Sequence, residues 1–253
     1  MNYIPISDWP NIPKDIYLKE ATSVATDSKD NIYIFNRGEI PVLVFSDDGK
    51  LIDSWGKGEF VRPHGIFIDQ DDILYLVDDG GHFLKKCTKD GKVLMTIGSL
   101  GNPTEWQKGG YFNRPTDVTI DSDGFLYISD GYGNSRIHKF DEVGKHITSW
   151  GRPGTDPGEF NLPHNICLVD DKYLWVCDRE NFRVQIFDKE GVWVNQLHFH
   201  RPQSIFRGKG KLEGFILLAE AGTGMHTQEG VPDIGNIVRI LDYKGNTIKK
   251  IGD

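Results

Sequence analysis

Long apolar runs, paired cysteines and clusters of basic residues are all missing from this 253-residue sequence. Its longest apolar runs have the length of a strand and are too short to cross a membrane. Residues 1–10 lack the basic and apolar segments of a signal peptide. The formal net charge of −8 argues against nucleic acid, because phosphate binding needs clustered Lys and Arg. We therefore predict neither a membrane nor a nucleic-acid partner, while the oligomeric state stays open.

Cysteine is scarce, and none of the three residues Cys87, Cys167 and Cys177 belongs to a C-x-x-C pair. The odd number and the wide spacing predict neither a disulfide framework nor a zinc–thiolate site. Packing in the core as reduced thiols is the plain interpretation. Together with the absence of a signal peptide, this predicts a cytoplasmic location.

The apolar residues do not recur with a helical period, but the sequence contains an internal repeat. Turn pairs recur at intervals of 42, 53, 47 and 54 residues: Asp48-Gly49, Asp90-Gly91, Val143-Gly144, Glu190-Gly191 and Lys244-Gly245. Strand-like runs flank each turn, as in SVATD, NIYIFN, VLVFS and LIDSWG of the first unit. Four short strands cannot stand alone, but four-stranded blades packed around an axis bury both faces. The repeat therefore predicts an all-β propeller.

Five such units cover residues 20–253, and residues 1–19 form a lead-in segment. At about 49 residues per blade, six blades would need roughly 290 residues in addition to the lead-in. The chain is then either a five-bladed ring or a six-bladed propeller with about five blades present. The alternation described next favours the second interpretation and predicts a further blade that opens with Pro-His.

The residue that opens the first strand of each unit alternates between histidine and another residue. This position holds Thr22, His64, Thr116, His164 and Gln203 in turn. In a six-fold ring, histidines from alternate blades would converge on the axis as a three-histidine metal site. Such a site suits catalytic zinc and leaves a fourth position for water or substrate. The alternative is that His64 and His164 are ordinary histidines near turns.

Arginine occupies the end of the second strand in units one and four, as Arg37 and Arg179. Antiparallel pairing places this position beside the start of the first strand, on the same face as the histidines. Two guanidinium groups near a metal suit an anionic substrate, because arginine binds carboxylates in a planar, bidentate way. The alternative is an ion pair with a neighbouring acid such as Asp178 or Glu180.

In unit three the same loop reads DGYGNSR and carries Tyr132 between Gly131 and Gly133. A phenol near a cationic metal and two arginines suits a general base, because positive charge favours its ionised form. The alternative is a tyrosine that lies on the propeller face. The other histidines occupy no repeated slot and are interpreted as surface or packing residues: His82, His138, His146, His198, His200 and His226.

Four segments together resemble the NHL-repeat lyases that cleave peptidyl-α-hydroxyglycine to a peptide amide and glyoxylate. They are PTDVTIDSDGFLYISDGYGNSRIHKF (115–140), FNLPHNICLVDDKYLWVCDRENFRVQIF (160–187), DSKDNIYIFNRGE (27–39) and RPHGIFID (62–69). The resemblance implies a six-bladed propeller with a catalytic zinc and a structural calcium. It places two zinc histidines on His64 and His164, the base on Tyr132 and the site arginines on Arg37 and Arg179. Two calcium-binding backbone carbonyls fall on Val24 and Ile66.

The sequence also departs from that family, since nothing here matches its third zinc histidine or its neighbouring calcium aspartate. We predict a metal-dependent carbon–nitrogen lyase that acts on a small or peptide substrate with a carboxylate. One alternative is a non-catalytic NHL propeller that binds protein or ligand as a scaffold. A lactonase-like hydrolase is the other, although such enzymes use acidic residues and Asn around calcium.

Overall fold

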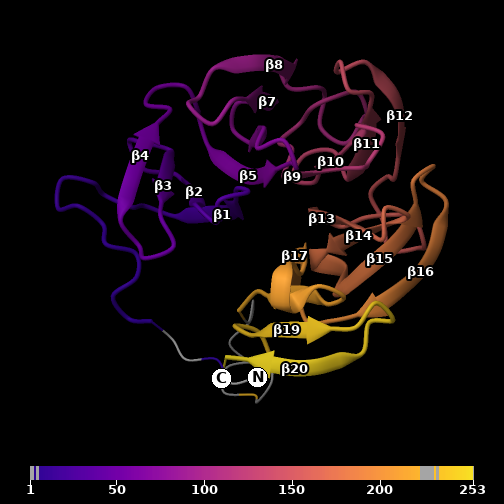
Figure 1. Ribbon diagram of the computed structural model, residues 1–253. Helices are drawn as coiled ribbons and strands as arrows, with labels where there is room; N and C mark the ends of the chain where they lie inside the picture. Colours follow the sequence, from indigo (N-terminus) through magenta and orange to yellow (C-terminus); the bar gives the residue numbers. More distant parts are fainter. Residues whose placement is uncertain (1–2, 4–5, 223–230, 232–233, 253) are drawn as a thin grey trace. The chain divides into compact units, whose positions relative to one another are not determined.

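The computed structural model describes residues 3, 6–222, 231 and 234–252, and these form five four-stranded antiparallel sheets (Figure 1). Helical structure in this part of the chain is limited to two 3-10 turns, η1 (Arg179–Asn181) and η2 (Gly210–Leu212). Neither turn is long and apolar enough to span a membrane, and no other helix is present in these residues. The predicted all-β fold is therefore confirmed.

The chain divides into two compact units, the first made of residues 1–105 and 110–118 and the second of residues 106–109 and 119–253. The first unit contains two sheets, which we call blades one and two. Their strands are β1 (Ala21–Thr26), β2 (Ile32–Asn36), β3 (Val42–Phe45), β4 (Leu51–Trp55), β5 (Pro63–Ile68), β6 (Leu74–Asp78), β7 (Phe83–Cys87) and β8 (Val93–Gly98).

Blades three, four and five belong to the second unit, apart from the first residues of strand β9. Blade three has β9 (Asp117–Ile120), β10 (Leu126–Asp130), β11 (Arg136–Phe140) and β12 (His146–Trp150). Blade four has β13 (Pro163–Val169), β14 (Tyr173–Asp178), β15 (Arg183–Asp188) and β16 (Trp193–His198). Blade five has β17 (Pro202–Arg207), β18 (Ile216–Glu220), β19 (Val238–Leu241) and β20 (Thr247–Ile251).

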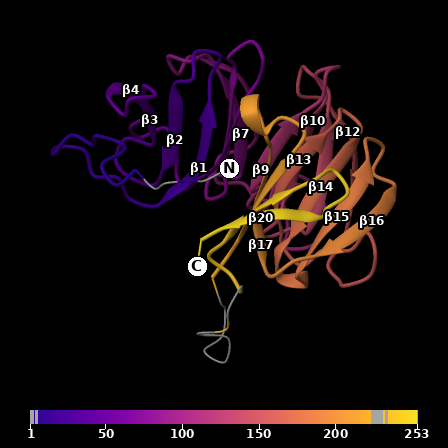
Figure 2. The same cartoon turned by 60° about the horizontal axis from the view of Figure 1, so that its bottom comes forward.

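Strands pair in sequence order within every blade, as Figure 2 shows for β13 to β16. The first residue of each first strand therefore lies opposite the last residue of the second strand. Pro63 pairs with Asp78, and Pro163 pairs with Asp178. The positions that hold histidine and arginine in the repeat thus lie at the same end of the strands in each blade, as the antiparallel pairing predicted.

An aspartate fixes the turn between the first two strands of several blades. In blade three, Asp121 Oδ1 accepts hydrogen bonds from the backbone N–H groups of Asp123 (3.1 Å) and Phe125 (2.9 Å). Its Oδ2 accepts a bond from the hydroxyl of Tyr127 at 3.0 Å. Aspartate favours such turns because its short carboxylate can bond to backbone N–H groups nearby. These local bonds explain why the hairpin recurs with the same residues.

Packing between neighbouring blades of one unit relies on a tryptophan set against a glycine. A Cβ on Gly191 would lie 2.5 Å from the ring of Trp150, and one on Gly91 would lie 2.9 Å from Trp55. Both glycines have φ of +85°, which other residues rarely adopt. The glycine of each Asp-Gly type turn therefore serves the turn and the contact between blades together.

Residues at the start of the chain lie against the outer hairpin of blade one. The indole Nε1 of Trp9 donates to the carbonyl oxygen of Asp47 at 3.1 Å, and Asn11 forms an isolated bridge with Lys50. No strand is found among the described residues before Ala21. The division into a lead-in segment (1–19) and a propeller (20–253) stays a prediction.

Candidate functional site

The two histidines of the repeated slot have the same environment in their own units. His64 is 7% exposed, and its Nδ1 lies 2.7 Å from the carbonyl oxygen of Thr116. His164 is 8% exposed, and its Nδ1 lies 2.8 Å from the carbonyl oxygen of Gln203. Thr116 and Gln203 occupy the same slot in the next blade, so the repeat itself supplies both partners. Sequence reasoning missed these carbonyls, although the slot alignment contained them.

These contacts define the tautomer of both rings. A carbonyl oxygen only accepts hydrogen bonds, so Nδ1 carries the proton and the neutral ring keeps the Nε2 lone pair. Histidines that bind zinc usually donate the second ring N–H to a carbonyl or carboxylate in this way. His64 and His164 therefore each fit the role of a zinc ligand. Within the described residues no group of three or more His, Cys, Asp or Glu side chains converges as a metal site.

Tyr132 lies beside His164 in the second unit. Its hydroxyl is 3.1 Å from Nε2 of His164, and the two rings meet edge to face with centroids 5.8 Å apart. Since Nδ1 of His164 holds the ring proton, the phenol donates and Nε2 accepts. The structure thus brings the predicted base into contact with a predicted zinc ligand.

Arg37 lies beside the strand that carries His64 in the first unit. Its Nε donates to the carbonyl oxygen of Pro63 at 3.2 Å, and its Nη1 donates to Glu20 at 2.6 Å. The hydrogen bond and the charge of Arg37 lower the pKa of the Glu20 carboxyl. The Arg37 side chain is 16% exposed, while that of Glu20 is 61% exposed.

Arg179 occupies the equivalent position in the second unit, where η1 begins. Its backbone N–H donates to the carbonyl oxygen of Leu162 at 3.1 Å, two residues before His164. Its Nε donates to Glu180 Oε1 at 2.7 Å, and Arg201 donates to the same oxygen at 2.9 Å. Burial raises the pKa of Glu180, but the bonds from Arg201 and Arg179 outweigh it and lower the pKa overall.

Both arginines therefore form ion pairs with neighbouring acids, as the alternative interpretation of these residues predicts: Arg37 with Glu20 and Arg179 with Glu180. A guanidinium has five N–H donors, however. The bonds to described residues use two of them at Arg37 and one at Arg179. The remaining N–H groups can bind a carboxylate.

The two positions predicted to bind calcium both lie in the first unit. Val24 is in β1 and is 59% exposed, whereas Ile66 is in β5 and is buried. Each of these strands lies at the edge of its sheet. Calcium takes oxygen ligands, backbone carbonyls among them, and binding at these two positions stays a prediction.

The histidines outside the repeated slot have diverse surroundings. His138 is buried, and its Nε2 lies 3.3 Å from Asp130 Oδ2. Nδ1 of His82 accepts a bond from the backbone N–H of Arg114 at 3.1 Å. His198 and His200 line a surface depression described below. His226 lies outside the described residues.

Models of known families match most of the blades. A model of the NHL repeat matches residues 112–140 and 160–187, and a model of a 6-bladed β-propeller matches residues 13–87. NHL repeat-containing protein 3 of Homo sapiens is 30% identical over 247 residues, which cover 90% of this chain and 70% of the human protein. The chain belongs to the NHL-repeat proteins.

Among its NHL-repeat relatives is an amidating enzyme. The probable peptidyl-α-hydroxyglycine α-amidating lyase of Caenorhabditis elegans is 37% identical over 150 residues, which cover 58% of this chain and 42% of the worm protein. The chain thus spans less than half the length of that relative. Homology to the lyases is shown at this distance, as the sequence motifs predicted.

The fold also resembles that of solved structures. A Bacteroides caccae protein of unknown function matches with a TM-score of 0.68 and 12% identity, covering 96% of this chain and 84% of that one. At such low identity the likeness supports the propeller fold alone.

Proposed function

We propose that this NHL-repeat protein is a metal-dependent lyase that cleaves an N-acyl or N-peptidyl α-hydroxyglycine to an amide and glyoxylate. The observation that carries the proposal is the contact between Tyr132 and His164 at 3.1 Å. It pairs a phenol with an imidazole that already has the hydrogen bonding of a zinc ligand. The lyase relative in Caenorhabditis elegans supports the same reaction.

Tyr132 would act on the substrate hydroxyl. As the phenolate it takes the hydroxyl proton, and the electron pair of that O–H bond forms the carbonyl group of glyoxylate. The carbon–nitrogen bond breaks, its electron pair stays on nitrogen, and the nitrogen recovers a proton from Tyr132. The residue thus serves first as base and then as acid.

Arg37 and Arg179 would bind the substrate carboxylate through the N–H groups that their acidic partners do not use. A planar guanidinium can hold both carboxylate oxygens and so position the α-carbon. Arg179 directly follows β14, which pairs with β13, the strand that carries His164. The backbone N–H of Arg179 donates to the carbonyl oxygen of Leu162, two residues before His164.

His64 and His164 would each offer Nε2 to zinc, and the carbonyl groups of Val24 and Ile66 would bind calcium. Zinc would act as a Lewis acid on the substrate hydroxyl. In the described structure Nε2 of His164 accepts the Tyr132 hydroxyl, so metal binding requires that hydroxyl to leave the nitrogen. We further propose a reducing, cytoplasmic setting, which the burial of the three cysteines and the absence of a C-x-x-C pair support.

The test is release of glyoxylate from α-hydroxyhippurate by the full-length protein, with and without added zinc. Zinc-dependent release of glyoxylate and benzamide in equal amounts is expected. A protein that releases neither product with zinc and calcium present is not this lyase.

A second candidate is a non-catalytic propeller that binds a protein or ligand. The observation in its favour is the similarity to NHL repeat-containing protein 3, whose name specifies no activity and which matches 90% of this chain. Absence of turnover together with unaltered folding of the purified protein would favour this candidate.

A further inference from the structure

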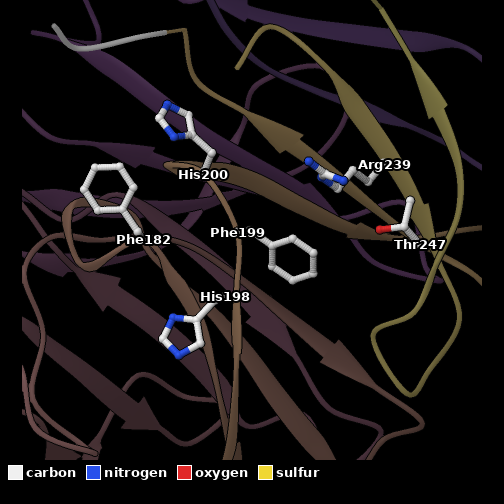
Figure 3. Close-up of a pocket in the computed structure, with 6 residues that line it drawn as sticks. All are labelled: Phe182, His198, Phe199, His200, Arg239 and Thr247. Atoms are coloured by element: carbon white, nitrogen blue, oxygen red, sulfur yellow. The ribbon is translucent and has the colours of Figure 1, made fainter. Parts of the chain in front are cut away.

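A depression of about 510 Å³ opens on the surface of the second unit between blades four and five. Figure 3 shows the two histidine rings on either side of the two phenylalanine rings, with Arg239 and Thr247 beyond Phe199. The lining residues are Phe182, His198, Phe199, His200, Arg239 and Thr247.

This depression exists because blade four departs from the repeat. In blades one to three, the outer strand ends at a glycine or directly before one, and a phenylalanine from the following loop covers that glycine. A Cβ on Gly151 would lie 2.6 Å from the ring of Phe160, and one on Gly98 would lie 3.0 Å from Phe112. In blade four this glycine is replaced by His198, and the tryptophan before it in blades one and three is replaced by Leu197.

The following loop in blade four is also the shortest. It comprises residues 199–201, compared with 57–62, 99–114 and 152–162 in the preceding blades. Phe112 and Phe160, which belong to the longer loops, are completely buried. Phe199 packs against the core between blades four and five but stays half-buried. The short loop therefore leaves open an aromatic face that the longer loops of blades two and three close.

The depression lies at the same end of the blade-four strands as His164 and Arg179. Asp178 pairs with Pro163 on one side and with Arg183 on the other, and Arg183 pairs with His198. Phe182 donates its backbone N–H to the carbonyl oxygen of Arg179 at 3.2 Å. One wall of the depression thus begins three residues after the arginine that we assign to the substrate carboxylate.

The charges around the depression favour an uncharged occupant. The guanidinium of Arg239 makes two hydrogen bonds to the buried carboxylate of Glu220, at 2.6 and 3.2 Å. It also lies over the ring of Phe199, 5.9 Å from its centroid. Because this cation is already balanced, the site offers no net charge to an anion. It offers the rings of Phe182, Phe199 and His200, which suit another aromatic ring.

We infer that this depression binds the aromatic side chain of the residue that precedes α-hydroxyglycine in the substrate. The inference rests on the proposed function and names the class of peptide on which the lyase acts. The substrate carboxylate is held at Arg179, and the neutral aromatic group extends toward Phe182 at the same end of the strands. The ligand ring would rest on Phe199, at a position where the loop phenylalanines of blades two and three, Phe112 and Phe160, are buried.

The test compares N-acetyl-Phe-α-hydroxyglycine with N-acetyl-Ala-α-hydroxyglycine as substrates of the full-length protein. We expect kcat/KM about tenfold higher for the Phe substrate, because its ring buries more apolar area than a methyl group and adds contacts between aromatic rings. Thr247→Trp places a ring in the depression and should remove this preference. Ile248→Trp is the matched control, since the next residue of β20 is on the opposite face and is 58% exposed.

Equal kcat/KM for both substrates in the parent protein would overturn the inference, and so would a preference that survives in Thr247→Trp. If neither substrate is turned over, the proposed function fails and calorimetry with the product amides decides the site separately. Binding of N-acetyl-Phe-amide by the parent and by Ile248→Trp, but not by Thr247→Trp, supports the depression as an aromatic site. Absence of binding by the parent refutes it.

Discussion

His64 and His164 occupy the same slot and have the same carbonyl partner on Nδ1, yet their neighbours differ. Next to His64, the loop that follows β2 supplies the guanidinium of Arg37, which bonds to Pro63. Next to His164, the loop that follows β10 supplies the phenol of Tyr132. The repeat thus sets the position and tautomer of both imidazoles, while loop residues one position apart supply a cation in one unit and a phenol in the other.

The largest effect is expected where the two histidines are alike. Changing either His64 or His164 to Ala should lower zinc affinity at least about tenfold and reduce zinc-supported turnover about 10³-fold, because each change removes a ligand. Elemental analysis of the purified variants and glyoxylate release measure the two effects. For zinc content, His198→Ala is the control, because this exposed histidine lies outside the repeated slot. Unchanged zinc content in both slot variants would mean that they are packing residues.

Tyr132→Phe tests the neighbour that belongs to His164 alone. We expect turnover to fall about 10²-fold or more, because the base is lost. The melting temperature should change little, since only one hydroxyl of a half-buried residue is removed. Tyr17→Phe, at a site that is 79% exposed, serves as the control. Full activity in Tyr132→Phe would exclude the phenol from the reaction.

Arg37→Lys and Arg179→Lys test whether each arginine binds the substrate carboxylate. Each should lower kcat/KM about tenfold, because an ammonium cannot replace the planar guanidinium fork. A substrate amide without the carboxylate should be poor for the parent and insensitive to both changes. If the arginines serve only in ion pairs, the variants would lose thermal stability and treat acid and amide alike.

The smallest effect concerns Glu180, which bonds to both Arg179 and Arg201. Glu180→Gln should lower the free energy of unfolding by about 1 kcal/mol or less at pH 7, as for partly exposed ion pairs. Because the folded protein lowers the pKa of Glu180, this stability is present above the unfolded pKa and is lost as the pH falls through the folded one.

Urea unfolding of the parent and Glu180→Gln at pH 7 and pH 3 checks this, with the difference expected to be smaller at the lower pH. Glu20→Gln is the counterpart in the first unit and should leave stability unchanged, because the Glu20 side chain is 61% exposed. A larger loss for Glu20→Gln would reverse the comparison between the two ion pairs.

The sequence by itself determined the four-stranded repeat and the end of the strands at which the repeated histidine and arginine positions lie. Period-two alternation and short polar turns specify antiparallel hairpins, and these place the end of the second strand beside the start of the first. That local rule was enough to align His64 with His164 and Arg37 with Arg179. The five blades and the propeller fold were confirmed on the same basis.

Only the tertiary structure decided which atoms meet. The carbonyls of Thr116 and Gln203 reach the histidines because the next first strand packs against the slot, which depends on how blades stack and not on any local pattern. The same packing brought Tyr132 to Nε2 of His164 and left Phe199 half-buried. Loop lengths are readable in the sequence, but burial of a side chain depends on contacts between segments far apart in the chain.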